Sequence, residues 1–242
     1  MDRLIYTIMS AADRLQYSLQ LHANNMANAQ TDGFRADLEL AESRDVRGVG
    51  YDSRHQVDLT ANRIDQTTGQ SIETGRALDA AIDGPGYFAV QTSKGEAYTR
   101  DGNFQIDGDG RLTVAGNPVV GEMGPIVLPQ YDSVKIGADG TISILPSGQT
   151  EMQVVDKLKL VREPAPASIT KNDAGLIVSQ NGSPLPDDPS VVVRGEHIET
   201  SNVSPVNELM KTMTLNRDFE IQMRLYKAAD DNAEQGNQLI RG

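Results

Sequence analysis

Residues 1–33 read MDRLIYTIMS AADRLQYSLQ LHANNMANAQ TDG. The first 29 contain neither Gly nor Pro, and apolar side chains recur at alternating steps of four and three. The row consists of Met1, Ile5, Ile8, Ala12, Leu15, Leu19, Met26 and Ala29, with His22 as its polar member. This spacing predicts an amphipathic helix over residues 4–29 with a coiled-coil seam, which ends at the turn before Gly33. A packed or interfacial role is expected for His22.

The C-terminal end of the chain shows the same spacing of apolar residues. Ser204 followed by Pro205 is typical of a helix start. From there a second row runs at steps of three and four through Leu209, Met213, Asn216, Phe219, Met223, Tyr226, Asp230, Ala233, Asn237 and Ile240. We expect a helix to residue 240, whose polar row members weaken the seam but can fix its register.

The middle of the chain alternates with a period of two and is rich in Gly turns, which predicts an all-β domain over residues 80–200. Strands are expected at residues 87–91, 96–100, 104–107, 111–114, 118–120, 126–128, 134–136, 141–145, 153–162, 176–179 and 191–194. Polar residues 34–79 are expected to be an extended connector with room for short strands. The predicted fold is therefore mostly β with α-helical ends: an all-β central domain inserted between coiled-coil-forming helices at residues 1–33 and 201–242.

Composition limits the function classes. The chain has 242 residues and a net charge of −12, which argues against nucleic-acid binding and against docking on anionic membranes. The absence of Cys removes disulfides and thiolate metal sites. Hydrophobic content of 38% suggests a chain that finds part of its core in a partner. The sequence has no run of about 18 apolar residues, so we expect no direct membrane insertion. The N-terminus lacks the pattern of a cleaved Sec signal.

Several segments resemble sites of chemistry, but each has a simpler interpretation. Residues 107–110, Asp-Gly-Asp-Gly, lack the spacing and the Glu of a calcium loop and predict a hairpin turn. Residues 84–86, Gly-Pro-Gly, lack the helix and Lys of a phosphate loop. The three His residues lie in different segments, and no carboxylate pair is singled out. We therefore predict no catalytic, cofactor-binding or metal-binding residues, and no small-molecule substrate.

Four segments carry a family resemblance, in the right order along the chain. Residues 22–35, HANNMANAQTDGFR, are similar to the ANNLANxxTxGFK motif of bacterial flagellar rod and hook proteins. Residues 84–90, GPGYFAV, resemble the GxGFF-V segment. The YTRDGNF stretch at 98–104, continued through residue 119, resembles the YTRxGxF…DxxGxLV…GxPV signature. Residues 199–206, ETSNVSPV, and the Arg217–Glu220 stretch resemble the C-terminal LExSNV…REFE motif.

The resemblance implies a structural subunit that stacks helically into a tube, with the terminal helices as the inner layer and the β domain outside. It implies export by the flagellar type III apparatus without a cleaved signal, a place in the periplasmic rod of the basal body, and torque transmission. Its partners would be other rod subunits and further copies of itself. Residues 1–9, MDRLIYTIM, are most similar to proximal-rod members; a distal-rod or hook subunit is the alternative within the family.

The resemblance and the two rows together predict an assembly interface. Its residues are Ile5, Ile8, Leu15, Leu19, Asn24, Asn25, Met26, Asn28, Leu209, Met213, Asn216, Phe219, Met223, Tyr226 and Ile240. For the three Asn residues, capping or solvent exposure is as well supported as bonding between helices or subunits. From the residues alone, two alternatives stay open. One is that the two helices pack on the β domain. The other is that the chain is a secreted β-rich hydrolase or glycan-binding module.

Overall fold

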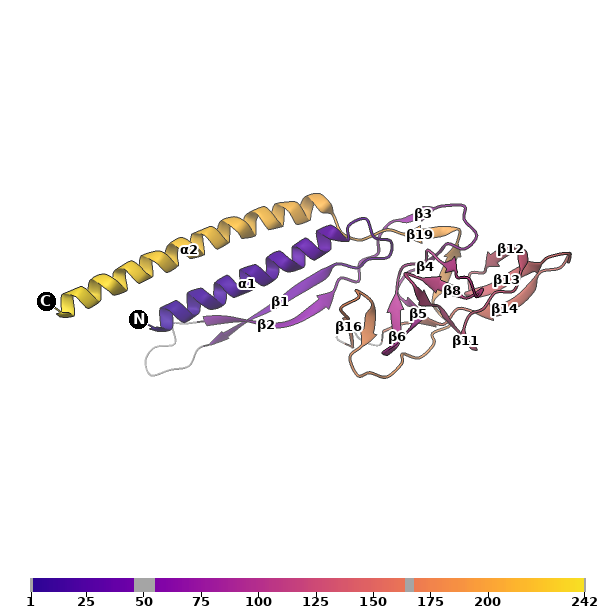
Figure 1. Ribbon diagram of the computed structural model, residues 1–242, viewed down its shortest axis with the longest axis horizontal. Coiled ribbons are helices and arrows are strands. Elements are labelled where there is room, and N and C mark those ends of the chain that lie inside the picture. Colours follow the sequence, from indigo (N-terminus) through magenta and orange to yellow (C-terminus); the bar gives the residue numbers. More distant parts are fainter. Residues whose placement is uncertain (1, 46–54, 164–167, 242) are drawn as a thin grey trace. The chain divides into compact units, whose positions relative to one another are not determined.

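The computed structural model describes residues 2–45, 55–163 and 168–241, which form two compact units (Figure 1). Unit 1 contains Met1–Ala27, Asp37–Arg63 and Ser204–Gly242, and unit 2 contains Asn28–Ala36 and Ile64–Val203. Both terminal segments thus belong to one unit, and the central part of the chain makes the other. The architecture is mostly β with one helix near each end, which confirms that part of the prediction.

Unit 1 is a helix pair with a small sheet. α1 (Asp2–Ala27) and α2 (Pro205–Arg241) lie side by side and run in opposite directions (Figure 1). β1 (Asp37–Asp45) and β2 (His55–Ile64) pair with each other, and β1 packs against α1. Over its described residues, neither helix carries a stretch that is long and apolar enough to cross a bilayer.

Unit 2 is built from short antiparallel strands. The largest sheet has the order β15–β5–β6–β17–β16, formed by Leu160–Val161, Tyr87–Thr92, Gly95–Thr99, Ile177–Ser179 and Ile169–Lys171. A three-stranded sheet follows the order β12 (Tyr131–Ile136), β13 (Thr141–Pro146), β14 (Gln153–Lys157). Another has the order β7 (Gln105–Ile106), β8 (Leu112–Val114), β9 (Asn117–Pro118).

Three strand pairs complete unit 2. They are β10 (Val120–Gly121) with β11 (Gly124–Pro125), β18 (Val192–Gly195) with β4 (Ala80–Asp83), and β19 (His197–Glu199) with β3 (Ser71–Glu73). The last two pairs join strands more than a hundred residues apart in the sequence, so unit 2 is closed by its C-terminal segment.

The interior of unit 2 is apolar and well covered. Phe88 and Phe104 are fully buried and meet edge to face, with ring centroids 5.1 Å apart. Ile142 and Ile144 of β13 point into the same cluster, which alternation along the strand requires. The turn at residues 107–110 links β7 to β8, as predicted, and the Asp107 carboxylate accepts hydrogen bonds from the amides of Asp109 and Arg111.

The structure changes several strand predictions. The strand expected at 153–162 is interrupted at Leu158 and Lys159, where the chain passes from the β14 sheet to the β15 sheet. At 126–128 no ladder forms, and the neighbouring Gly124–Pro125 pairs instead. The strands β3, β4, β16 and β19 were not expected. β4 was not predicted because its Ala80–Ile82 run is buried on both faces, so apolar and polar residues do not alternate along it.

Residues 34–79 differ most from expectation. They do not form one connector: β1 and β2 give their central part to unit 1, while both ends belong to unit 2. The strands are hidden in a polar composition, in which only Leu38 with Leu40, and Val57 with Leu59, show the alternation. The part of the connector at residues 46–54 lies outside the described residues.

Candidate assembly surface and the junction of the sequence motifs

The face of α2 that packs along α1 can be followed by burial. Its least exposed positions lie at steps of four and three, at Glu208, Thr212, Leu215, Phe219, Gln222, Tyr226 and Ala229. Of the predicted row, only Phe219 and Tyr226 belong to this inner face. The other members of the row miss it by one position: Leu209 follows Glu208, and Met223 follows Gln222.

The opposite side of α2 exposes large apolar side chains. Val206, Leu209, Met210 and Met213 lie within the first turns of the helix and are 47–65% exposed. Ile221, Met223 and Leu225 are also exposed further along. Leu209, Met213 and Met223 were predicted to be interface residues, and the predicted Asn216 is exposed among them. Within a single chain, these apolar side chains keep about half of their surface in contact with solvent.

The predicted residues of α1 fall into different environments. Leu15, Leu19 and Met26 are half-buried. Ile5 and Ile8 lie in α1 and Ile240 in the last turns of α2, but their side chains are outside the described residues. The helix therefore contributes to packing inside unit 1 along part of the predicted row.

A polar contact links the two helices. Nδ1 of His22 lies 2.5 Å from Oε2 of Glu208, and both side chains are largely shielded from solvent. Lys211 donates to the other Glu208 oxygen at 2.9 Å. Burial opposes ionisation of Glu208, but the hydrogen bonds from Lys211 and His22 together outweigh it and lower its pKa. His22 is thus an interfacial histidine within the chain, as its place in the helical row suggested.

Other polar side chains fasten α1 to β1. The side chain of Asn25 is buried, donates to the Asp37 carbonyl at 3.0 Å and accepts from the Asp37 amide at 2.9 Å. Glu39 accepts hydrogen bonds from Arg14 and Ser18. Within the chain, Asn25 therefore pairs with the backbone of a strand that the sequence did not reveal.

Asn24 is exposed, and Asn28 lies just beyond the end of α1. There Asn28 accepts from the Thr31 hydroxyl at 3.2 Å, while its carbonyl accepts from the Thr31 amide at 3.1 Å. Both of these hydrogen bonds lie in the turn that follows α1.

Unit 2 holds a buried ion triad. Glu199 is 2% exposed, and its carboxylate lies between two arginines, Arg35 at 4% and Arg100 at 1%. Nη2 of Arg35 is 2.8 Å from Oε1, and Nε of Arg100 is 2.8 Å from Oε2. The Gly69 amide donates a further hydrogen bond to Oε1 at 2.9 Å. Each carboxylate oxygen is therefore occupied by strong donors.

The triad brings together residues from three of the sequence motifs. Arg35 ends the first, Arg100 lies in the YTRDGNF stretch and Glu199 begins the C-terminal motif. Around it, the Gly33 amide donates to the Glu199 carbonyl at 2.7 Å, and the Asn202 side chain accepts from the Ala36 amide at 2.8 Å. The motifs therefore meet inside unit 2.

The GPGYFAV motif supplies the rest of this environment. Arg100 donates to the carbonyls of Gly84 and Gly86 at 2.8 Å and of Ile82 at 3.1 Å. Gly86 has φ +141°, and a Cβ there would lie 2.8 Å from Val191. Both the backbone conformation and the close approach of Val191 therefore favour glycine at this position.

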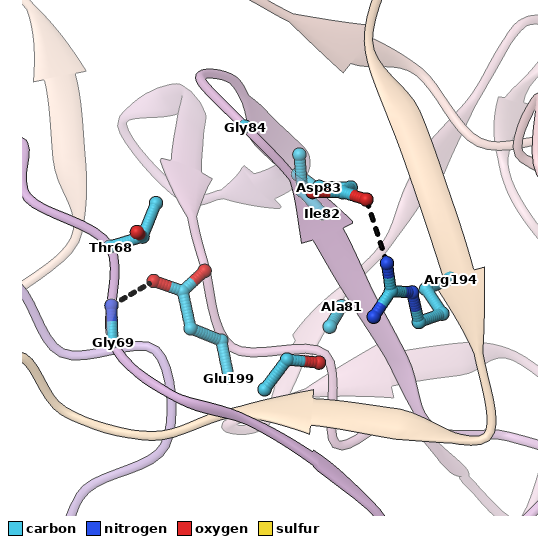
Figure 2. A pocket seen from close by; sticks show the side chains of 9 residues that line it. Thr68, Gly69, Ala81, Ile82, Asp83, Gly84, Arg194 and Glu199 are labelled. Atoms are coloured by element: carbon cyan, nitrogen blue, oxygen red, sulfur yellow. Dashed lines mark hydrogen bonds and ion pairs between the residues drawn. The ribbon is translucent and has the colours of Figure 1, made fainter.

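A pocket of about 230 Å³ opens beside the triad (Figure 2). Thr68, Ser71 and the exposed ion pair of Arg194 with Asp83, at 2.8 Å, line it together with Glu199. Figure 2 shows the Glu199 carboxylate directed at the Gly69 amide. Because its oxygens are already bonded to two arginines and an amide, the Glu199 carboxylate holds parts of unit 2 together.

Sequence reasoning did not single out Arg35, Arg100 or Glu199 as a group. Each lies in a quoted motif, but the three are far apart along the chain and no local spacing connects them. The only signal in the sequence was that charged residues occupy fixed places in otherwise structural motifs.

The chain is similar to known proteins over its whole length and in two matched segments. Residues 81–144 match the flagellar hook protein FlgE/F/G D1 domain, and residues 194–239 match the C-terminal domain of the flagellar basal body rod FlgEFG proteins. The chain is 38% identical to the flagellar basal-body rod protein FlgF of Escherichia coli and 38% identical to that of Salmonella typhimurium, over 99% of each chain. It is 30% identical to the rod protein FlgG of Bacillus subtilis, over 96% of both.

The matched segments include the 84–90 and 98–104 motifs and α2, and the similarity to the full-length relatives covers α1 as well. The chain therefore belongs to the flagellar basal-body rod proteins, a family of structural subunits, and among these relatives it is most like those named FlgF.

Proposed function

We propose that the chain is a proximal-rod subunit that assembles through its terminal helices with other rod subunits and with further copies of itself. The observation that carries this proposal is the exposed apolar cluster of Val206, Leu209, Met210 and Met213 on the outer side of α2. Apolar side chains on one helix face favour association when the opposite face is already packed. A neighbouring helix, in coiled-coil packing, would cover this cluster.

In this assembly unit 2 projects outward and the helices form the inner layer of a tube. The tube serves as an export channel and transmits torque, which requires rigid packing and no catalysis. The subunit reaches the periplasmic part of the basal body through the flagellar type III export apparatus without a cleaved signal. The relatives named FlgF and the MDRLIYTIM start support a proximal position.

Substitution of Met213 by Asp tests the proposal. Because Met213 is 58% exposed, Met213→Asp should leave the circular dichroism spectrum and melting of the chain nearly unchanged. It should nevertheless abolish motility and rod assembly when it replaces the chromosomal copy, since a charge buried in an apolar interface is costly. Electron microscopy of isolated basal bodies reports assembly directly.

The matched control is Asn207→Asp, which adds the same charge in the first turn of α2 with almost the same shape. Its motility should equal that of the wild type. Phe219→Asp differs from both, because Phe219 lies on the inner face and its loss should weaken the α1–α2 pair as well. A motile Met213→Asp strain with complete basal bodies would rule out assembly through this side of α2.

A further inference from the structure

The buried triad of unit 2 has an unusual charge balance. Arg35 and Arg100 place two cations against the single anion of Glu199, and all three side chains are at least 96% buried. Arg100 is otherwise satisfied by the carbonyls of Ile82, Gly84 and Gly86, which compensate its hydrogen bonds but not its charge. Glu199 is therefore the counter-ion for both arginines.

Arginine gives the chain no alternative way to lose this charge. A buried lysine can release its proton, but a guanidinium stays protonated in proteins. Burial and the neighbouring Arg100 both lower the pKa of Arg35; Glu199 opposes them most strongly, and Tyr87 and Asp65 oppose them less. Without the carboxylate, unit 2 must either bury two adjacent cations or leave them in water, and either choice prevents its interior from closing.

Glu199 also arrives with the strands that complete unit 2. β18 pairs with β4, with Val193 opposite Ile82, and β19 pairs with β3, with Ile198 opposite Ile72. The residues around Glu199 bind the N-terminal segment through the Gly33 and Ala36 amides. The counter-ion and the missing strand partners are thus delivered by one short segment, residues 192–202, near the end of the chain.

We propose that the Glu199 carboxylate is a completion lock, which makes folding of unit 2 conditional on the arrival of residues 192–202. Until this segment docks, Arg35 and Arg100 keep the unit open. Once it docks, residues 33–36, Arg100 at the end of β6 and residues 192–202 are held together in one step. The lock is a property of unit 2 and does not depend on the proposed function.

The experiment compares full-length variants by equilibrium denaturation and stopped-flow refolding. In all of them Phe replaces the other five tyrosines, so the fluorescence of Tyr87 and Tyr98, which are buried in the core of unit 2 in a chain without Trp, reports on unit 2. Glu199→Gln keeps the shape and removes the charge. We expect its folding equilibrium constant to fall about 100-fold or more. Asp83→Asn is the matched control: it removes the exposed ion pair with Arg194 in the same unit and should change the constant less than about 5-fold.

The triple variant Arg35→Gln, Arg100→Gln, Glu199→Gln removes all three charges but keeps an amide donor at both arginine positions for the carbonyls that the arginines bind. If the uncompensated arginines keep the unit open, the folding constant of this variant should exceed that of Glu199→Gln by at least about 10-fold, even if Glu199→Gln does not fold at all. A triple variant as unstable as Glu199→Gln would overturn the charge argument, as would a Glu199→Gln effect no larger than that of Asp83→Asn.

Kinetics separate a lock from an ordinary stabilising contact. If docking of Glu199 gates folding, the loss in Glu199→Gln appears as slower refolding, with little change in the unfolding rate. A contact that forms after the rate-limiting step would instead speed unfolding. Unchanged refolding together with faster unfolding would therefore overturn the lock.

Discussion

Large apolar side chains are buried in unit 2 but exposed on the outer side of α2. In unit 2, Phe88, Phe104 and Leu112 are fully buried among other apolar residues. On α2, Leu209, Met210 and Met213 are about half exposed or more. Burial of one such side chain contributes about 1.5–3 kcal/mol. Unit 2 obtains this free energy within one chain, whereas α2 leaves it available to a neighbour.

The contrast extends to polar groups. Unit 2 buries a complete ion triad, which is stable only because each charge has its partner in the same unit. Unit 1 connects its helices through His22 and Glu208 and its sheet through Asn25, a few contacts around half-buried apolar positions. Under the proposed function, a subunit combines one unit that is completed within its own chain with a helical unit that gains stability on assembly.

The largest expected effect tests the core of unit 2. Phe104→Ala removes a fully buried ring and its contact with Phe88, and should lower the free energy of unfolding by about 3–5 kcal/mol. Met213→Ala removes an apolar side chain of α2 and should change it by less than about 0.5 kcal/mol. Guanidinium denaturation of both variants measures the difference, and equal losses would erase the distinction between the two regions.

The next effect concerns the docking of the N-terminal segment in unit 2. Gly33 has φ +66°, and a Cβ there would lie 2.2 Å from the Asp101 amide nitrogen. We expect Gly33→Ala to cost about 3 kcal/mol, from left-handed backbone strain plus overlap. Gly75 has φ +68° with open space around it, so Gly75→Ala should cost only about 1 kcal/mol. Thermal melts of the pair isolate the overlap, and similar costs would show that Gly33 is needed for its φ alone.

A smaller effect is expected in unit 1. Glu208→Gln should weaken the helix pair by about 1.5 kcal/mol, because it removes charge-assisted bonds from Lys211 and His22. The folded-state pKa of Glu208 lies below its usual value, so its stabilisation is present above about pH 4.5 and is lost as the pH falls through the folded-state pKa. Helix melting followed at 222 nm should show this acid sensitivity in the wild type and not in Glu208→Gln.

The smallest effect has the opposite sign and belongs to unit 2. Burial raises the pKa of Asp101 to about 6; its bond from the Asn103 amide acts against this, and the nearby Asp32 and Asp79 add to the rise. The folded state therefore binds a proton more readily than the unfolded state, and stability increases as the pH falls. Between pH 7.5 and pH 5 the gain should be about 1 kcal/mol.

Urea denaturation followed by tyrosine fluorescence at both pH values measures this gain. Asp101→Asn is the control, because it has no proton to bind and should lose the difference. A wild-type unit 2 that is less stable at pH 5 than at pH 7.5 would contradict the assignment to Asp101.

Much of the fold could be predicted from local patterns. The absence of Gly and Pro with a three-four repeat predicted both helices, and the Gly turns with alternation predicted β5, β6 and β13 within one or two residues. The patterns failed where polar composition concealed strands, as in β1 and β2, and where burial on both faces removed alternation, as in β4. The motif segments predicted the family, which the relatives confirm.

The helical ends, the β middle and the family can be read from the amino-acid sequence, because they depend on short-range periodicity and on contiguous motifs. The packed side of α2 and the shared buried site of Arg35, Arg100 and Glu199 become visible only in the folded chain. The inner face of α2 contains Glu208 and Gln222, whose burial depends on partners that no pattern displays. The triad joins residues 35, 100 and 199, and contacts at such separations arise from strand pairing rather than from spacing.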